Sequence, residues 1–274
     1  MYPLVVRKLL IDLEAPFPRR WNGGDAFTSA FMNALSMSFP VGEQFFIDSL
    51  RRGLKALPPD LQAQHAQDVK LFAGQEATHR HLHGLFNHHL ENQGLVNHWA
   101  VRAQKRVTQV EKLDVRHGVA ATAATEHFTE VLSHWLLSHP DFLAKAEPRI
   151  RTMWMWHASE ESEHRSIAFD LYAALGGNLT WRLRWMRLMT LFLLIDLLRQ
   201  TVNNLWHDGS LFQFGTWRSA SVFLFGKQGL LRSSLPTWRR YFQPDFHPAQ
   251  DDDSLSRQWL QTHENDYSPV GSPT

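Results

Sequence analysis

The chain contains no cysteine among its 274 residues. Disulfide bridges, thiolate zinc sites, cysteine-ligated iron–sulfur clusters and cysteine nucleophiles are therefore excluded. Because a lack of cysteine is typical of a reducing compartment, we expect the protein in the cytoplasm. The segment Met1–Leu13 is broken by Arg7 and Lys8, so it does not have the continuous apolar core of a secretory signal.

The chain also has no excess of charge of one sign, since its formal net charge is only +1. A chain with this balance has no general attraction to nucleic acid, and we expect no nucleic-acid partner. Neither a Gly-rich dinucleotide-binding motif nor the Gly-x-Ser-x-Gly motif of serine hydrolases occurs. In contrast, histidine and tryptophan are abundant, with 16 and 11 residues. Excess imidazole indicates metal binding.

Helical periodicity dominates the chain, and strand patterns are sparse. We therefore predict an all-α fold, a ferritin-like four-helix bundle over residues 1–178 with additional helices after it. In the first helix, Pro40 either kinks the helix or starts a second piece capped by Ser38. The helices expected in the bundle are 25–57 with Asp25 as N-cap, 60–92 with Asp60 as N-cap, 97–138 with a break near Gly118, and 148–175.

Residues 179–248 differ in character from the bundle. A segment rich in tryptophan and arginine leads into the apolar run Leu188–Leu198, which contains Asp196 and is too short to span a membrane. Gly215 and Gly226 are expected breaks further on. These helices either pack across the bundle or lie peripherally at the inner face of the membrane. The tail, residues 249–274, is acidic and polar, and we expect it to be loosely ordered.

Two Glu-x-x-His motifs lie on the second and fourth predicted helices, Glu76–His79 and Glu161–His164. Residues i and i+3 share one face of a helix, so each motif can direct a carboxylate and an imidazole at one point. A single pair of this kind is weak evidence, because short motifs recur by chance.

The order of two further glutamates strengthens the metal hypothesis. Glu43 and Glu126 lie among apolar or small residues on the first and third predicted helices. The chain thus runs Glu, Glu-x-x-His, Glu, Glu-x-x-His, which is the inward-facing ligand set of di-iron and di-manganese carboxylate bundles. Four carboxylates would neutralise two divalent ions in an apolar interior. We predict two metal ions, iron before manganese, bound by Glu43, Glu76, His79, Glu126, Glu161 and His164.

The ligand on the fourth helix has rivals. Glu160 and Glu163 are close to Glu161 in sequence, and we favour Glu161 because it stands three residues before His164.

Other positions also stay open. Glu126 competes with Glu130, one turn further on. His83 and His157 share the ligand faces of their helices, so each is an additional ligand, an outer partner that orients a ligand, or an ordinary hydrogen-bonded histidine. The histidines outside these motifs are expected at the surface or in the core.

At these residues the sequence resembles a bacterial family catalogued as predicted metal-dependent hydrolases, within the ferritin-like di-iron superfamily. The resemblance covers roughly Arg7 to Pro248 and shows no departure at the proposed ligands. The family's name implies hydrolysis, whereas its fold implies oxygen chemistry. The matching pieces are Phe39-Pro40-x-Gly42-Glu43, Gln75-Glu76-x-x-His79-x-x-x-His83, Glu126-His127, Trp156-His157-x-x-Glu160-Glu161-x-Glu163-His164, Ala168-Phe169-Asp170-Leu171-Tyr172 and Trp238-x-x-Tyr241-Phe242-x-Pro244-Asp245-Phe246-His247-Pro248.

Three functions follow, in order of preference. The first is a di-iron enzyme that uses dioxygen to hydroxylate or desaturate a hydrophobic small molecule. Such an enzyme needs a separate electron-donor reductase, because the chain carries no redox-cofactor motif of its own. The second is a two-metal hydrolase, in which the metals activate water. The third is an iron-binding or storage bundle. A homodimer is compatible with each of them.

Overall fold

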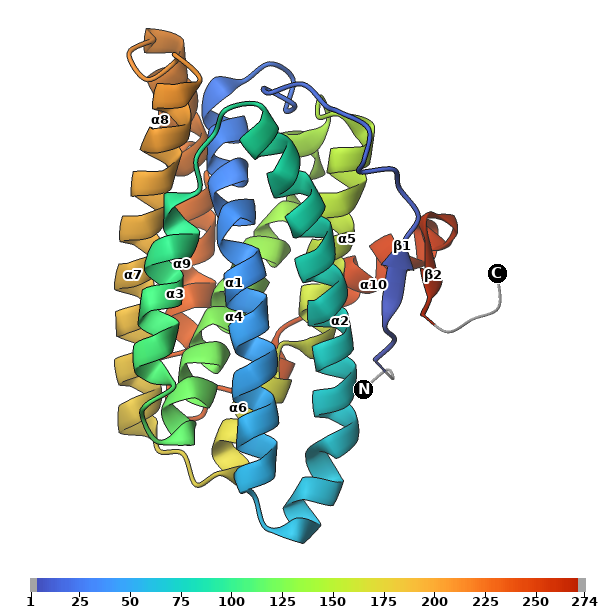
Figure 1. Ribbon diagram of the computed structural model, residues 1–274, viewed down its shortest axis with the longest axis vertical. Helices are drawn as coiled ribbons and strands as arrows, with labels where there is room; N and C mark the ends of the chain where they lie inside the picture. The colour runs from blue at the N-terminus through green and yellow to red at the C-terminus, as the bar shows by residue number, and fades with distance from the viewer. Residues whose placement is uncertain (1–3, 271–274) are drawn as a thin grey trace.

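Four long helices form the body of the molecule (Figure 1). The computed structural model describes residues 4–270, and helices dominate this range, which confirms the all-α prediction. Helix α1 packs against α2 and α4, and α5 packs against α4 and α2, so the four helices enclose a common interior. Their bounds are α1 Ala26–Ala56, α2 Pro59–Asn92, α4 Val115–Ser138 and α5 Pro148–His164.

Helix α1 continues without interruption through Pro40, so the alternative of a new piece capped by Ser38 is wrong. Proline has no N–H to donate to the carbonyl four residues earlier, here that of Ser36. The side-chain amide of Asn87 donates to this carbonyl instead, at 2.8 Å. A proline in α1 is thus compensated by a polar side chain of α2.

The third predicted helix is two helices, α3 (His98–Val110) and α4, and the break lies at residues 111–114 instead of near Gly118. Asp114 caps α4 by accepting a hydrogen bond from the backbone N–H of Arg116. Gly118 lies inside α4, where an added Cβ would stand 3.3 Å from the Cβ of Ser49. Glycine at this position allows α4 to approach α1 closely.

Two other helix boundaries differ from the prediction. Helix α2 is preceded by Pro58, so Asp60 lies in the first turn instead of capping it. The fourth predicted helix ends at His164, and Arg165 and Ser166 separate it from α6 (Ile167–Ala174). The Arg165 side chain donates to backbone carbonyls of the C-terminal segment, which fixes that segment beside the break.

The helices after residue 178 pack on the bundle. Helix α7 (Leu179–His207) contacts α1 and α4, α8 (Phe214–Phe225) contacts α1, and α9 (Leu230–Arg240) contacts α4. Asp196, inside the apolar run, forms ion pairs with Arg102 and Arg106 of α3. Gly226 ends α8, but Gly215 lies inside it and is not a break. No helix among residues 4–270 is long and apolar enough to cross a membrane.

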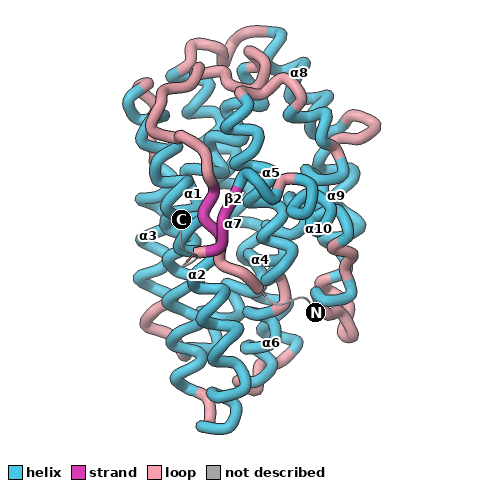
Figure 2. The backbone as a smooth tube through the Cα atoms, turned by 90° about the vertical axis from the view of Figure 1, so that its right-hand side faces the viewer, coloured by secondary structure: helices cyan, strands magenta, loops and turns pink. Residues whose placement is uncertain are grey.

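Residues 249–270 form regular elements instead of the loosely ordered tail that their composition indicates, and residues 271–274 of the expected tail lie outside the described residues. Helix α10 (Ser254–Thr262) packs on α5, and strand β2 (Tyr267–Pro269) pairs antiparallel with β1 (Arg7–Leu9) near the other end of the chain. Figure 2 shows this strand pair on the face of the bundle that carries α10. Polar residues contribute to the packing, since Ser256 donates to the carbonyl of Ser159. Short 3-10 helices cover Pro140–Leu143, Pro248–Gln250 and Glu264–Asp266.

The core is divided into two apolar clusters along the bundle. One includes Phe86 and Trp156, and the other includes Phe72 and Leu171. On α2 four buried polar residues lie between Phe72 and Phe86: Gln75, Glu76, His79 and His83. A polar layer therefore lies between two apolar ones.

Candidate metal centre

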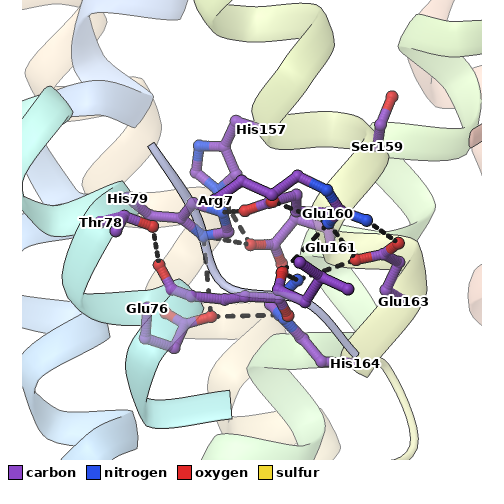
Figure 3. A network of polar contacts seen from close by, with 12 residues as sticks. Arg7, Glu76, Thr78, His79, His157, Ser159, Glu160, Glu161, Glu163 and His164 are labelled. Carbon is purple, nitrogen blue, oxygen red and sulfur yellow. Dashed lines mark hydrogen bonds and ion pairs between the residues drawn. The ribbon is translucent and has the colours of Figure 1, made fainter. Parts of the chain in front are cut away.

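Six buried carboxylate and imidazole side chains meet in this polar layer, and Figure 3 shows four of them at close range. They come from all four bundle helices, and each is at most 3% exposed. Helix periodicity explains the convergence, because i and i+3 positions on α2 and α5 face the interior together. The six are the residues expected from the sequence: Glu43, Glu76, His79, Glu126, Glu161 and His164.

The ligand atoms form adjacent groups in which all atoms lie within 4.8 Å of one another. One group contains Glu76, Glu126, Glu161 and His164, and another contains Glu43, Glu76 and His79. Glu76 belongs to both groups. The arrangement therefore offers two neighbouring cation positions that share a carboxylate.

Both motif histidines turn one ring nitrogen toward these carboxylates. The Nε2 atom of His164 lies 3.1 Å from Glu76 Oε1 and 3.3 Å from Glu126 Oε2. The Nδ1 atom of His79 lies 3.3 Å from Glu161 Oε1 and 3.8 Å from Glu76 Oε1. Separations of this size bring all the donor atoms within reach of a small cation.

Hydrogen bonding among the six residues is incomplete. Nine of their buried nitrogen and oxygen atoms have no hydrogen bond, including both oxygens of Glu43, Glu76 and Glu126. Buried polar atoms are almost always hydrogen-bonded, and a buried carboxylate without a partner is very unfavourable. The oxygen-rich donor set with two imidazoles therefore fits bound metal ions.

Comparison with known proteins agrees with this geometry. A family model described as a predicted metal-dependent hydrolase matches residues 5–252. The chain belongs to this family. The description supports metal dependence, and it favours the hydrolytic alternative over the oxidative function that we expected first. No curated protein and no solved structure matches the chain.

Electrostatics in this family member are governed by burial. Burial raises the pKa of Glu126 to about 8 and raises the pKa of Glu43 well above its usual range. Burial also opposes a charge on His79, but the carboxylates of Glu160 and Glu161 outweigh it and raise the pKa of His79 to about 10. Burial alone would raise the pKa of Glu161, yet the surrounding histidines hold it well below its usual range. Without a cation, protons and charges are thus shared unevenly among the carboxylates.

Glu160 and Glu163, the rivals of Glu161, lie outside the ligand groups, and Glu160 contacts the outer side of His79. The Nε2 atom of His79 lies 3.0 Å from Glu160 Oε2. The Arg7 guanidinium from strand β1 donates to Glu160 at 2.9 Å and to Glu163 at 2.7 Å. Figure 3 shows Arg7 between these two carboxylates. Such outer contacts fix the orientation of a ligand ring.

His164 has an equivalent outer partner in Gln75. The Nδ1 atom of His164 lies 3.0 Å from Gln75 Oε1, and the Gln75 amide donates to Glu163 and to the backbone of Val5. Arg7 and Gln75 were not expected as site residues. For Gln75, its position next to Glu76 was a signal in the sequence, whereas Arg7 is 153 residues away from Glu160.

His83 and His157 form a hydrogen-bonded chain that ends at the centre. The Asn87 amide nitrogen donates to the Ser36 carbonyl, so the Asn87 side-chain oxygen accepts from the Ser36 hydroxyl at 2.8 Å. The Ser36 oxygen then accepts from Nδ1 of His83, also at 2.8 Å. Because burial holds the pKa of His83 well below its usual range, its Nε2 is an unprotonated acceptor.

The second step of this chain sets the tautomer of His157. Its Nδ1 lies 2.6 Å from His83 Nε2 and must be the donor. Burial and the nearby charge of His79 lower the pKa of His157 to about 4, so its ring is neutral. The lone pair of its Nε2 therefore points to Glu161 Oε1, 2.8 Å away.

Glu130, the rival of Glu126, lies outside the ligand groups. It accepts a hydrogen bond from Ser162 at 2.9 Å, and burial raises its pKa to about 7. In the described part of the chain, the histidines outside the Glu-x-x-His motifs, apart from His83 and His157, do not belong to a ligand group.

An apolar chamber adjoins the centre. Its volume is about 40 Å³, and His157 and Glu161 are among the residues that line it. Phe31, Phe39 and Leu132 are among the apolar residues that line it. The chamber can hold an apolar group or a diatomic molecule beside the ligand cluster.

Proposed function

We propose that the chain is an enzyme with two metal ions, held by the six converging residues. The observation that carries the proposal is the set of nine buried ligand atoms without hydrogen bonds. Four carboxylates in one buried layer need compensating positive charge, and two divalent cations supply it. Glu76 belongs to both overlapping ligand groups, so it would help to hold both ions.

We further assign His157 as a seventh ligand. A neutral ring whose lone pair lies 2.8 Å from a carboxylate oxygen is repelled unless a proton or a cation is close to both. His79, His157 and Glu161 form a ligand group of their own, which supports a cation beside all three. His83 shares a further ligand group with Glu43 and His157. Because its Nε2 accepts from Nδ1 of His157, we assign His83 as an outer partner that orients His157.

The reaction that the geometry supports best is oxidation of a hydrophobic small molecule with dioxygen. Four glutamates and two histidines on a four-helix bundle are typical of di-iron and di-manganese carboxylate proteins. Two iron ions in this site would supply redox chemistry toward dioxygen, with electrons from a separate reductase. The apolar chamber excludes water and positions the substrate beside His157 and Glu161.

Hydrolysis is the second candidate, and the family description favours it. Metal ions would then supply a Lewis acid and lower the pKa of water. The side chains would have to hold a polar ester or amide. The chamber offers few polar groups for this role, apart from Thr129, Ser133 and the ligands themselves.

One experiment separates the two reactions. Metal-depleted protein is loaded without oxygen with ferrous iron, or with the redox-inert zinc ion. We expect rapid oxygen uptake by the iron form after reduction, and no turnover of hydrophobic nitrophenyl esters by the zinc form. Ester turnover without oxygen, together with no oxygen uptake, would establish the hydrolase and refute the oxidase.

Two controls sharpen this experiment. Glu76→Ala should abolish either activity, whereas Glu91→Ala on the exposed side of the same helix should leave it unchanged. An iron content well above two per chain would instead favour storage.

A further inference from the structure

Helices α7, α8 and α9 carry an unusual amount of exposed apolar surface. Among the described residues, fifteen of the twenty large hydrophobic side chains that are exposed lie between residues 179 and 248. Phe212 and Phe214, in and next to the turn that joins α7 to α8, are 85% and 83% exposed. Exposed apolar surface concentrated in this way marks a contact with another molecule or with lipid.

A large groove opens on this surface. Its volume is about 520 Å³, and it runs between α7 on one side and α8 and α9 on the other. Six large hydrophobic residues both line the groove and are exposed, and we call them the groove rim: Leu194, Leu198, Trp217, Phe225, Leu231 and Leu235. Figure 1 shows α7 along the left edge of the molecule, with α8 beside its upper end.

Charge separates this region from the rest of the chain. Residues 179–248 contain nine lysines and arginines but only three acidic residues, a net charge of +6. The remaining residues have 19 basic and 24 acidic side chains, a net charge of −5. Arg218, Lys227 and Arg232 are exposed on or beside α8 and α9. The exposed apolar residues are therefore accompanied by positive charge.

We propose that the α7–α9 face docks on an anionic lipid bilayer, with the exposed aromatic residues inserted among the lipids. Exposed aromatic and aliphatic side chains next to arginine and lysine are typical of segments that lie in a membrane interface. A second copy of the chain fits this face less well. A two-fold dimer through the face would place the two cationic surfaces against each other.

The groove gives this docking a purpose for the proposed enzyme. Phe31, Leu132 and Leu230 line both the groove and the chamber beside His157 and Glu161. An apolar chain that leaves the bilayer through the groove rim thus follows apolar side chains toward the metal centre. This step rests on the proposed function, whereas the docking itself does not.

Vesicle binding of the full chain, with and without metal, tests the docking. The protein is sedimented with vesicles of phosphatidylcholine alone, or with added phosphatidylglycerol. We expect strong binding only with phosphatidylglycerol, and release in high salt. Phe212→Ser with Phe214→Ser should weaken binding at least about tenfold, because two large apolar side chains no longer enter the bilayer.

Charge variants separate docking from general electrostatic attraction. The triple change Arg218→Gln, Lys227→Gln and Arg232→Gln should abolish the preference for phosphatidylglycerol. The matched control changes the same charge outside residues 179–248, by Arg51→Gln, Lys70→Gln and Arg151→Gln, and should bind like the unchanged chain. All these positions are exposed in the unchanged chain. Circular dichroism verifies that each variant folds.

Several outcomes would overturn the proposal. They are no binding to either vesicle, equal loss in the charge control, or a concentration-dependent dimer that the double serine variant converts to monomer without vesicle binding. The last outcome would assign the face to a second copy. Metal content and turnover in detergent are independent readouts, so failure of docking and failure of the enzyme can be distinguished.

Discussion

Within the bundle, carboxylates and imidazoles are buried without enough hydrogen bonds, whereas on α7–α9 large apolar side chains lie in solvent. Each region reverses the usual distribution of polar and apolar groups. Both arrangements are costly for the isolated chain, and both become favourable with a partner of the right kind. For the interior we propose a cation pair as this partner, and for the surface a lipid layer. Groups that lower the stability of the isolated chain in this way are characteristic of functional sites.

The largest effect should follow from removing one interior ligand. Glu76→Ala or His164→Ala is expected to abolish metal binding, because each residue faces several other ligands. The metal-free Glu76→Ala variant should be more stable than the metal-free unchanged chain, by roughly 1–3 kcal/mol, since one buried carboxylate without a hydrogen bond is removed. Metal-free His164→Ala should instead be less stable, because the carboxylates lose a compensating positive charge. Metal analysis with thermal melting measures both. Unchanged metal content would remove the residue from the ligand set.

A second prediction distinguishes the glutamates of α5. Glu161→Ala should lower the metal content per chain, whereas Glu163→Gln should leave it at two ions, because Glu163 faces Arg7 and Gln75. The measurement is metal content after equilibration with excess ferrous iron. A loss of metal in Glu163→Gln equal to that in Glu161→Ala would contradict the assignment.

Arg7 should have a smaller effect on metal affinity than any direct ligand. Arg7→Gln removes the charge that holds Glu160 against His79, and we expect about 10–100-fold weaker metal binding at unchanged stoichiometry. Competition with a metal chelator gives the affinity. Lys8→Gln, on the same strand but exposed, is the matched control.

The pH dependence of the interior follows from the raised pKa values. In the metal-free chain the pKa of Glu126 is raised to about 8 and that of His79 to about 10, so the folded state keeps protons that the unfolded state has lost. Stability of the metal-free chain should therefore fall as the pH rises from about 7 to 9. Metal binding needs both groups without protons, so the stabilisation by metal should grow over the same range.

Melting temperatures with and without metal, taken at several pH values, test this pair of opposite trends. A metal-free melting temperature that rises toward pH 9 would contradict the proton sharing in the centre.

The smallest effect is expected on the surface. Phe212→Ser with Phe214→Ser should change the free energy of unfolding in solution by less than about 0.5 kcal/mol, because both side chains are mostly exposed. Denaturant unfolding measures this. A loss of several kcal/mol would show that these residues stabilise the fold, and the contrast with the interior would then be lost.

The periodicity of the sequence was sufficient to predict a helical bundle and the convergence of the six residues in its interior. The spacing of Glu76 and His79 on one helix is a local property, and the helix order places the four glutamates at one level. The role of Arg7 was not predictable, because contacts across 153 residues have no local signature. The same holds for Asn87, whose function depends on the carbonyl that Pro40 leaves free.

Helix ends and the C-terminal segment were predicted less well. Gly118 looked like a break but serves close packing of α1 and α4, and the polar composition after Ala249 hid a helix and a strand. In both cases tertiary contacts decide the conformation, and local propensity does not reveal them.

The pairing of β1 with β2 links the centre to the order of protein synthesis. Leu9 pairs with Tyr267, 258 residues later, and Arg7 belongs to the earlier strand. A growing chain on the ribosome therefore contains all six inward-facing residues long before it contains the strand that fixes Arg7. During this interval Arg7 is not yet held by β2, so Glu160 would support the histidine of α2 less firmly than in the finished molecule.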